Sequence, residues 1–503
     1  MKTMKRILSL ALALILMLSF AACDGSGDNG GNSDLPTVRW IAVYNAAGGG
    51  IGRDEVDAEV KRYVAEKIGV NLDIVWIDEA SDDVLSTFII TGDYDVANIT
   101  AGLFNGNAKR NAFMALDDYI QYIPTAQDVL PESAFNALSV GGKLYGVLAY
   151  KDLAEIWGVL YNKDLFDEFD IEMPEYRSGR DLLPWAYEVT AKWRAANPNN
   201  ENSVVRLGTW LNSYFMYDGL CGGWGSPLAV TNIPGTAGFD SITDPNTVFC
   251  PYMTDDYLDF VKAYWKLAQD DIIPIAAGDG EARWSEGECF VTVSCGWIEP
   301  DPHLYSDSWE LGWYPCEDAI LTTGQLQSNI NVINAKCKNP EAAAKFLELT
   351  YSDEYLCTTL KFGIQGKDWE DADNDGVVEF LERNSDPTAR YWYHWYGARN
   401  SSVLGGKIAA GSTPEFPAKL EALNEAGVGS LHAGFVMDLE PVANEIAACE
   451  NVLAQYTNQI AYPAFADPAA FVEEFRNELK ANGIEKIIAE AQRQLDEWHK
   501  ANG

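Results

Sequence analysis

One short acidic segment carries the oxygen atoms that a calcium ion prefers. Its ligand positions and its glycine follow the spacing of an EF-hand loop: Asp371, Asp373, Asp375, Gly376, the carbonyl of Val377, and Glu382. Carboxylates this close repel one another unless a cation lies between them, so the segment predicts a calcium ion in a structural role. The alternative is a solvated Asp-Gly turn before the strand-like residues 377–380, because no helices clearly flank the loop.

Hydrolysis by paired carboxylates is a second chemistry to consider. The chain has 75 Asp and Glu residues, so pairs arise everywhere by chance and carry no argument. It has no Gly-x-Ser-x-Gly elbow between a strand and a helix and no His-Glu-x-x-His motif, and its four histidines are scattered. We therefore predict no catalytic residue and no enzyme, and keep a secreted glycoside hydrolase as the alternative.

Cys23 closes an N-terminal export signal. Residues 1–22 contain a basic start, the apolar run 7–20, and two alanines directly before the cysteine. The ending resembles a bacterial lipobox, which predicts lipidation of Cys23 and a flexible polar tether over 23–35. No second apolar stretch approaches the 18 residues that a membrane-spanning helix needs. We expect a body held by lipid on the extracellular face of a bacterial cell membrane; an ordinary secretory signal is the alternative.

Composition restricts what the body binds. The formal net charge is −39, which repels phosphate backbones, so we expect no nucleic-acid partner and favour a neutral ligand. The roughly 470 residues after the tether exceed what one hydrophobic core supports, which predicts at least two lobes. Eight cysteines follow Cys23 without a spacing that assigns a disulfide.

The chain alternates between strand and helix patterns. A strand is expected over 38–44, a helix along Val56, Val60 and Val64, a strand over 70–76, and another near 95–100. This order predicts a mostly parallel sheet covered by helices, in which ligands bind beyond the carboxyl ends of the strands. Asn45 and Thr100 hold such positions and are candidate ligand-binding residues.

The end of the chain is predicted to be helical. Asp467-Pro468 begins one helix, which Gly483 ends, and residues 484–495 line a second.

Several motifs together resemble one family. They are the segments 142–146 (GKLYG), 160–166 (LYNKDLF), 339–347 (NPEAAAKFL), 363–367 (GIQGK) and 494–498 (QLDEW). In this order they resemble the family 1 solute-binding lipoproteins of carbohydrate ABC importers, in particular the LipO-like subgroup. The resemblance implies an α/β, two-lobe periplasmic-binding-protein-like fold of type II with a hinge and a helical C-terminal segment. It implies lobe one at 36–148 plus 322–388 and lobe two at 150–320 plus 390–503.

The same resemblance implies further ligand-binding residues. Sugars need flat aromatic platforms and hydroxyl-binding carboxylates or amides. The positions that match are Glu155 and Trp157 in the hinge crossover, Trp210 and Asn212 on a strand of lobe two, Trp297, and Phe435. For Glu155 the alternative is a hydrogen bond within the hinge, and for Phe435 it is core packing.

We therefore expect a monomeric substrate-binding protein that captures a sugar, an oligosaccharide in most such proteins, by hinge closure. It would deliver this ligand to the permease subunits of an ABC transporter. A non-sugar solute such as a peptide is the alternative ligand.

Overall fold

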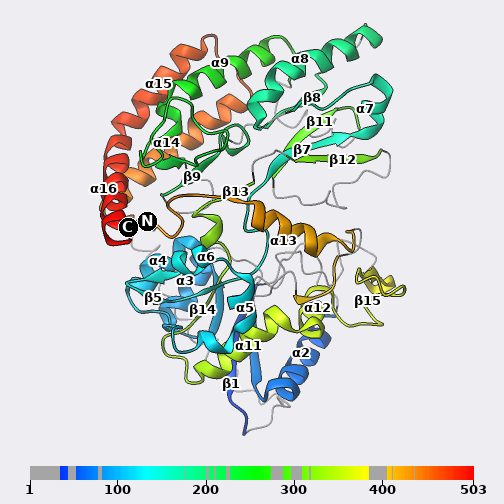
Figure 1. Ribbon diagram of the computed structural model, residues 1–503, viewed down its shortest axis with the longest axis vertical. Helices are drawn as coiled ribbons and strands as arrows, with labels where there is room; N and C mark the ends of the chain where they lie inside the picture. The colour runs from blue at the N-terminus through cyan, green and yellow to red at the C-terminus, as the bar shows by residue number, and fades with distance from the viewer. Residues whose placement is uncertain are drawn as a thin grey trace, which may run out of the picture.

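The computed structural model shows two lobes, one above the other, joined at a narrow waist (Figure 1). It describes residues 34–43, 52–77, 82–175, 177–199, 203–208, 211–221, 227–273, 287–295, 309–315, 319–384, 405–409, 412–435 and 437–502. Each lobe has its own sheet and its own buried core. The predicted α/β, two-lobe fold is confirmed.

Lobe one is built on a five-stranded sheet of order β2-β1-β3-β14-β6. Its strands are β1 (Thr37–Val43), β2 (Asn71–Ile77), β3 (Val96–Ile99), β6 (Val147–Leu148) and β14 (Ile330–Ile333). Its helices are α2 (Arg53–Ile68), α3 (Asp82–Thr91), α4 (Ala101–Lys109), α5 (Pro124–Val129), α6 (Glu132–Ala137), α11 (Pro340–Ser352) and α12 (Glu354–Phe362). The small hairpin β4 (Ser139–Val140) and β5 (Lys143–Leu144) and the 3-10 helices η1 (Ile120–Tyr122) and η5 (Gln325–Gln327) complete it.

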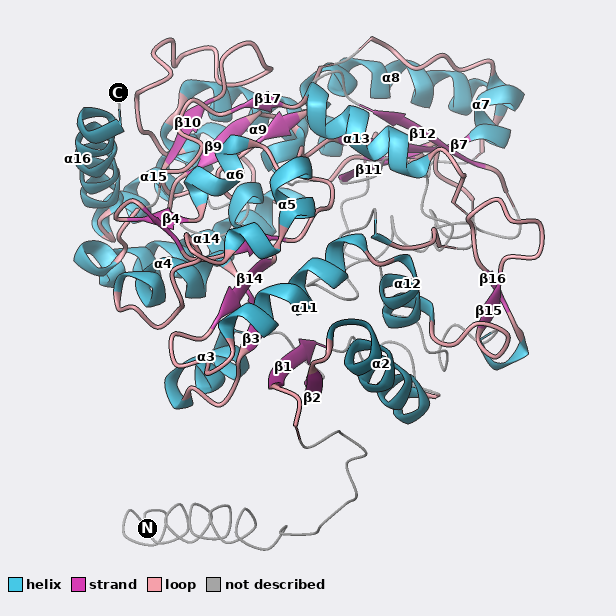
Figure 2. Cartoon of the chain, turned by 60° about the horizontal axis from the view of Figure 1, so that its bottom comes forward, coloured by secondary structure: helices cyan, strands magenta, loops and turns pink. Residues whose placement is uncertain are grey.

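The first elements of lobe one form as the sequence predicts. Strand β1 pairs in parallel with β2 and β3, and α2 buries Val56, Val60 and Val64. Gly69 ends α2 with φ 66°, a left-handed conformation that glycine adopts without steric cost. Figure 2 shows α2 and α11 lying beside β1 and β2 of this sheet.

Lobe two is built on a four-stranded sheet of order β12-β7-β11-β8 and a separate hairpin. Its strands are β7 (Trp157–Asn162), β8 (Val205–Arg206), β9 (Tyr217–Gly219), β10 (Val230–Asn232), β11 (Val291–Cys295) and β12 (Leu311–Pro315). Its helices are α7 (Lys163–Phe169), α8 (Gly179–Ala196), α9 (Asp255–Gln269), α14 (Ala443–Ala461), α15 (Pro468–Ala481) and α16 (Ile484–Asn502). The 3-10 helices are η2 (Leu211–Ser213), η3 (Pro251–Met253) and η8 (Glu440–Val442).

The C-terminal helices follow their predicted boundaries. The Asp467 side chain accepts hydrogen bonds from the backbone N–H groups of Ala469 and Ala470 and so begins α15. Phe475 and Leu479 are buried in the core of lobe two. Figure 1 shows α14, α15 and α16 grouped along one side of that lobe. No helix among the described residues is long and apolar enough to cross a membrane.

Within the described part of the chain, three segments cross between the lobes, and they are hydrogen-bonded to one another. The first runs through Glu155, the second contains β13 (Ile320–Leu321), and the third contains β17 (Val428–Gly429). Glu155 and Ile320 exchange backbone hydrogen bonds of 2.6 and 2.8 Å. Strand β13 pairs in parallel with β17, so the middle segment holds the other two.

The helix α13 (Phe416–Ala426) differs from the predicted lobe boundary. Residues 390–503 were expected in lobe two, but Leu420 is fully buried in the core of lobe one and Phe416 packs against the same core. The change to lobe two comes near Phe435, which belongs to the other core. The physical reason is that the apolar side chains of α13 exclude water only by packing on lobe one.

Asn424 on α13 fixes the first crossing segment. Its Oδ1 accepts the backbone N–H groups of Leu153 (2.7 Å) and Ala154 (3.2 Å), and its Nδ2 donates to the carbonyl of Lys151 (2.8 Å). These three backbone groups lie where the chain leaves lobe one and have no strand partner to satisfy them.

Buried polar groups also connect the hinge to lobe two. The carboxylate of Asp218, on β9, accepts the Thr323 N–H (2.9 Å) and hydroxyl (2.7 Å). Burial raises the pKa of Asp218, and the hydrogen bonds from Ser430 and Thr323 oppose that rise. The Thr323 hydroxyl also lies 3.2 Å from the carbonyl of His432 in the third crossing.

Replacing Asn424 with Ala should lower the free energy of unfolding by about 1–3 kcal/mol, because two buried N–H donors lose their acceptor. Urea denaturation measures this change. The control is Asn458→Ala, since Asn458 lies on the exposed face of α14 and its Nδ2 donates to the carbonyl of Ala454 within the same helix. Equal effects of the two substitutions would contradict a special role for Asn424.

Candidate functional site

In lobe one the described candidate, Thr100, lies at the end of the sheet that faces the hinge. Ile99, the last residue of β3, pairs with Ile330, which also pairs with Leu148 of β6 just before the first crossing. Thr100 follows β3, is partly exposed, and is the N-cap residue of α4 without a capping hydrogen bond from its side chain. Asn45 lies outside the described residues, two positions beyond β1, which runs parallel to β3.

In lobe two the described candidate Trp157 lies at the start of β7, next to the first crossing. Strand β11 is antiparallel to β7, and Cys295, its last residue, pairs with Trp157. Trp210 and Trp297 lie outside the described residues, so their place at this site stays a prediction.

Glu155 and Trp157 interact directly. The Trp157 indole Nε1–H donates to Glu155 Oε1 over 2.6 Å, and each residue is 3% exposed. This is a hydrogen bond inside the hinge, the alternative that the sequence left open for Glu155. The carboxylate orients the indole at the start of β7, and a sugar contact by either residue stays a prediction.

The predicted strand through Trp210, Asn212 and Tyr214 is wrong in its geometry. Residues Leu211–Ser213 form the 3-10 helix η2, and the backbone N–H of Tyr214 donates to the carbonyl of Leu211. Leu211 and Tyr214 are both buried, which is helical rather than alternating spacing. Trp210 itself and the side chain of Asn212 lie outside the described residues.

Phe435 lies in the core of lobe two. It is 2% exposed, and its ring packs edge-on against Trp498 of α16 with centroids 6.1 Å apart. Core packing, the alternative left open by the sequence, accounts for these contacts.

The acidic loop is a hairpin between two short strands. Strand β15 (Trp369–Glu370) pairs with β16 (Glu379–Phe380), so the loop lacks the helices that flank a true EF-hand. Its turn is nevertheless shaped as the EF-hand pattern predicts: Gly376 has φ 90° and its N–H lies 3.3 Å from Asp371 Oδ2. The backbone N–H of Val377 donates to Asp375 Oδ1 over 2.8 Å.

Three carboxylates of this loop converge. Asp371, Asp373 and Asp375 each offer an oxygen within 4.8 Å of the others. Oδ1 of Asp371 is buried and has no hydrogen-bond partner among the described residues, which is costly unless a cation takes it up. The residues present therefore fit calcium. Glu382, the predicted twelfth position, begins the 3-10 helix η6 (Glu382–Asn384) and is outside this group of oxygens.

Lys407 is a site residue that the sequence analysis missed. Its Nζ lies 2.8 Å from Asp371 Oδ2 and lowers the pKa of that carboxyl by hydrogen bonding. The two residues are 36 positions apart, and no local pattern joins them.

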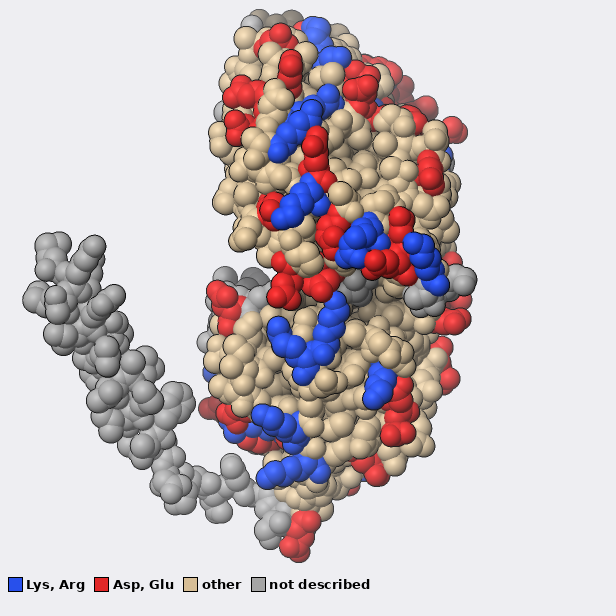
Figure 3. Space-filling model, turned by 90° about the vertical axis from the view of Figure 1, so that its left-hand side faces the viewer, with Lys and Arg blue, Asp and Glu red and all other residues tan. Residues whose placement is uncertain are grey.

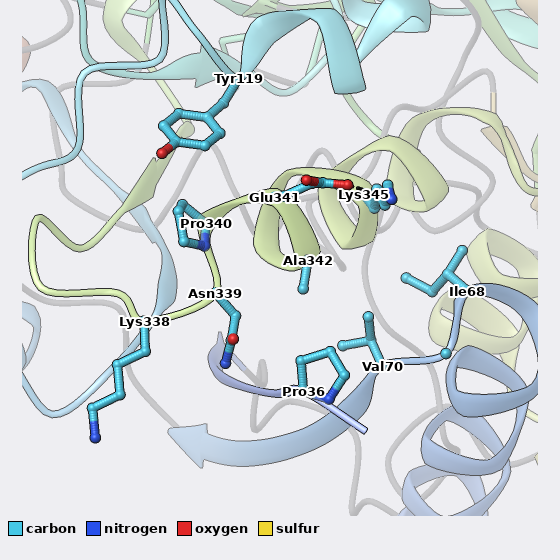
Figure 4. A pocket seen from close by; sticks show the side chains of 11 residues that line it. Pro36, Ile68, Val70, Tyr119, Lys338, Asn339, Pro340, Glu341, Ala342 and Lys345 are labelled. Atoms are coloured by element: carbon cyan, nitrogen blue, oxygen red, sulfur yellow. Dashed lines mark hydrogen bonds and ion pairs between the residues drawn. The ribbon is translucent and has the colours of Figure 1, made fainter. Parts of the chain in front are cut away.

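A surface pocket of about 440 Å³ lies at the opposite end of lobe one (Figure 4). Pro36 and Val70, which line it, precede β1 and β2, whereas ligands of open α/β sheets bind beyond the carboxyl ends of the strands.

Figure 3 shows the outline of the molecule notched at the waist, with acidic and basic side chains interspersed over this face. We therefore place the candidate ligand site at the waist.

Comparisons with known proteins find relatives in sequence and in fold. The model of a family described as "Domain of unknown function (DUF3502)" matches residues 431–500. A carbohydrate ABC transporter substrate-binding protein of Streptococcus pneumoniae serotype 4 (strain ATCC BAA-334 / TIGR4) is 22% identical, over 97% of both chains.

Solved structures extend the comparison. The N-glycan transport solute-binding protein NgtS of Streptococcus pneumoniae matches with a TM-score of 0.73 and 20% identity, over 93% of this chain and 100% of that chain. Its complex with Man1GlcNAc matches with a TM-score of 0.67 and 21% identity, over 92% and 100%. An EF-hand mutant of the S. pneumoniae ABC-transporter substrate-binding protein FusA, in complex with fructo-nystose, matches with a TM-score of 0.54 and 15% identity, over 93% and 100%. The resemblance that the sequence motifs predict is confirmed, and the chain has the fold of these solute-binding proteins.

Replacing Glu155 with Ala should lower the free energy of unfolding by about 1–3 kcal/mol, because the buried indole N–H of Trp157 loses its acceptor. Glu155→Gln should cost less, since its amide oxygen accepts the same bond. Denaturation followed by tryptophan fluorescence measures both. Identical losses in the two variants would show that the charge, not the acceptor, stabilises the hinge.

Proposed function

We propose that this chain is an extracellular substrate-binding protein that captures an oligosaccharide between its lobes and delivers it to an ABC transporter permease. The observation that carries the proposal is the pair of lobes, each with its own sheet and core, joined by described crossing segments that are hydrogen-bonded to one another. A ligand that contacts both lobes stabilises the closed arrangement by contacts that the open one lacks.

The relatives support sugar as the ligand class. The curated relative carries "carbohydrate" in its name, and NgtS and FusA have been solved in complex with glycans. The predicted aromatic and polar residues suit such ligands, because aromatic rings stack on sugar faces and carboxylates or amides bind hydroxyls. A peptide or other solute is the second candidate ligand.

A binding protein is favoured over a glycoside hydrolase. The relatives named above are binding proteins. The candidate carboxylate at the hinge, Glu155, already accepts the indole N–H of Trp157. A retaining or inverting mechanism needs two carboxylates flanking the scissile bond.

We propose two further features of the chain. Calcium is held by Asp371, Asp373 and Asp375, with the Val377 carbonyl and Glu382 as further ligands, and it stabilises the loop without chemistry. FusA, a neighbour of the same fold, is described as having an EF-hand. Lipid on Cys23 holds the protein at the cell membrane, and the acidic body acts there as a monomer.

The ligand is identified by titrating the protein lacking residues 1–34 with a library of oligosaccharides. We expect a saturable change in tryptophan fluorescence and a higher melting temperature with one glycan class, and no cleavage products. Trp297→Ala should weaken binding by about 1–3 kcal/mol, the cost of losing one stacking ring.

The control for this titration is Trp265→Ala. Trp265 lies on α9 and its indole donates to the carbonyl of Phe465, so its loss should lower stability and leave affinity unchanged. A response to peptides alone would overturn the sugar assignment, and glycan cleavage would overturn the binding function.

Removing calcium with a chelator should lower the melting temperature of the wild-type protein, because three close carboxylates then repel one another. Asp373→Asn combined with Asp375→Asn should abolish the difference between chelator and added calcium. Differential scanning calorimetry measures both. A melting temperature indifferent to calcium in the wild type would remove the metal site.

A further inference from the structure

The two carboxylate oxygens of Asp371 have different environments. Oδ2 accepts the Lys407 ammonium at 2.8 Å and lies 3.3 Å from the Gly376 N–H. Oδ1 is buried and has no hydrogen-bond partner among the described residues. The Asp371 side chain is only 4% exposed, so water does not compensate the unpaired oxygen. The protein itself supplies partners for Oδ2, whereas Oδ1 remains available to a ligand.

Lys407 is held in place by its own segment. Its backbone N–H donates to the Thr358 hydroxyl over 3.0 Å, and its Nζ also lies 3.6 Å from Glu354 Oε1. The next residue, Ile408, exchanges backbone hydrogen bonds of 3.0 Å with the acidic loop, donating to Gly376 and accepting from Val378. The backbone of Lys407 is therefore held beside the acidic loop, within reach of both Asp371 and Glu354.

The charges of the site follow from this arrangement. Asp373 and Asp375 are exposed, and Lys407 balances one of the three converging carboxylates. A divalent cation bound by the three carboxylates would share Asp371 with the Lys407 ammonium. The two positive charges would then lie on the same carboxylate and repel each other. The same ammonium lowers the repulsion between the carboxylates when the cation is absent.

We propose that Lys407 is a built-in counter-ion of the acidic loop, which keeps the loop folded without metal and weakens its affinity for calcium. The proposal rests on the calcium site inferred above and adds the residue that sets its affinity. The loop is then a low-affinity site that fills only where calcium is abundant, rather than a permanently occupied one.

Isothermal titration with calcium alone tests this on the wild type, Lys407→Gln and Lys407→Arg. Removing the charge should tighten calcium binding by roughly tenfold or more, and the arginine variant should stay close to the wild type. In chelator, Lys407→Gln should melt below the wild type, and added calcium should close that gap. The matched control is Lys345→Gln, since Lys345 pairs with Glu341 on the solvent-facing side of α11 and should change neither measurement.

The outcomes separate this proposal from the calcium site itself. Calcium binding of equal strength in the wild type and Lys407→Gln would overturn the role of Lys407 and leave the site intact. Binding in neither protein, with Lys407→Gln folded by circular dichroism, would remove the site and this role together. Neither result bears on sugar capture, which is measured separately.

Discussion

The architecture depends on the backbone pairing of the three segments that cross between the lobes. Ile320 lies in the middle one, bonded to Glu155 on one side, while its segment pairs with Val428 on the other. A rigid cross-connection of this kind confines relative motion of the lobes to rotation about one ribbon. It also explains why residues far apart in sequence end at the same place: β7, β12 and β6 all begin or end beside it.

Burial makes the polar contacts of this ribbon strong and costly to leave incomplete. The Asp218 carboxyl, fully buried, gains hydrogen bonds from Thr323 that offset part of the cost of its desolvation. His432 is likewise fully buried; burial lowers its pKa, and its Nε2 lies 3.0 Å from the carbonyl of Pro245. Such groups fix one arrangement of the crossings more specifically than apolar packing alone, because each has a directional partner.

Local patterns in the sequence predicted what local physics controls. The stripe of valines on α2 and the Asp467 cap are set by residues a few positions apart, and both are found in the structure. Elements whose form depends on distant partners were missed. Leu420 packs on a core assembled mostly from the first half of the chain, and Lys407 meets Asp371 across the return of the chain.

The candidate site also combines features that the sequence predicts with features that depend on distant partners. Strand register, which no local pattern gives, brings Trp157 beside Cys295 and so places the bonded pair Glu155 and Trp157 at one end of the sheet. The resemblance to a family supplied those positions before any register was known. The strand that it implied around Asn212 is a helical turn formed by Leu211–Ser213, and a ligand contact of Asn212 stays a prediction.

The late position of α13 in the chain has a consequence for biogenesis. The N-terminal lobe needs Leu420 and the helices α11 and α12 to complete its core, so it cannot finish folding while only its first 150 residues have been synthesised. Contacts of such long sequence separation slow folding and keep a nascent polypeptide open until most of its length exists. A polypeptide that stays open this long can be threaded through a secretion channel before its structure forms. The position of α13 therefore delays the completion of lobe one until Leu420 has been synthesised.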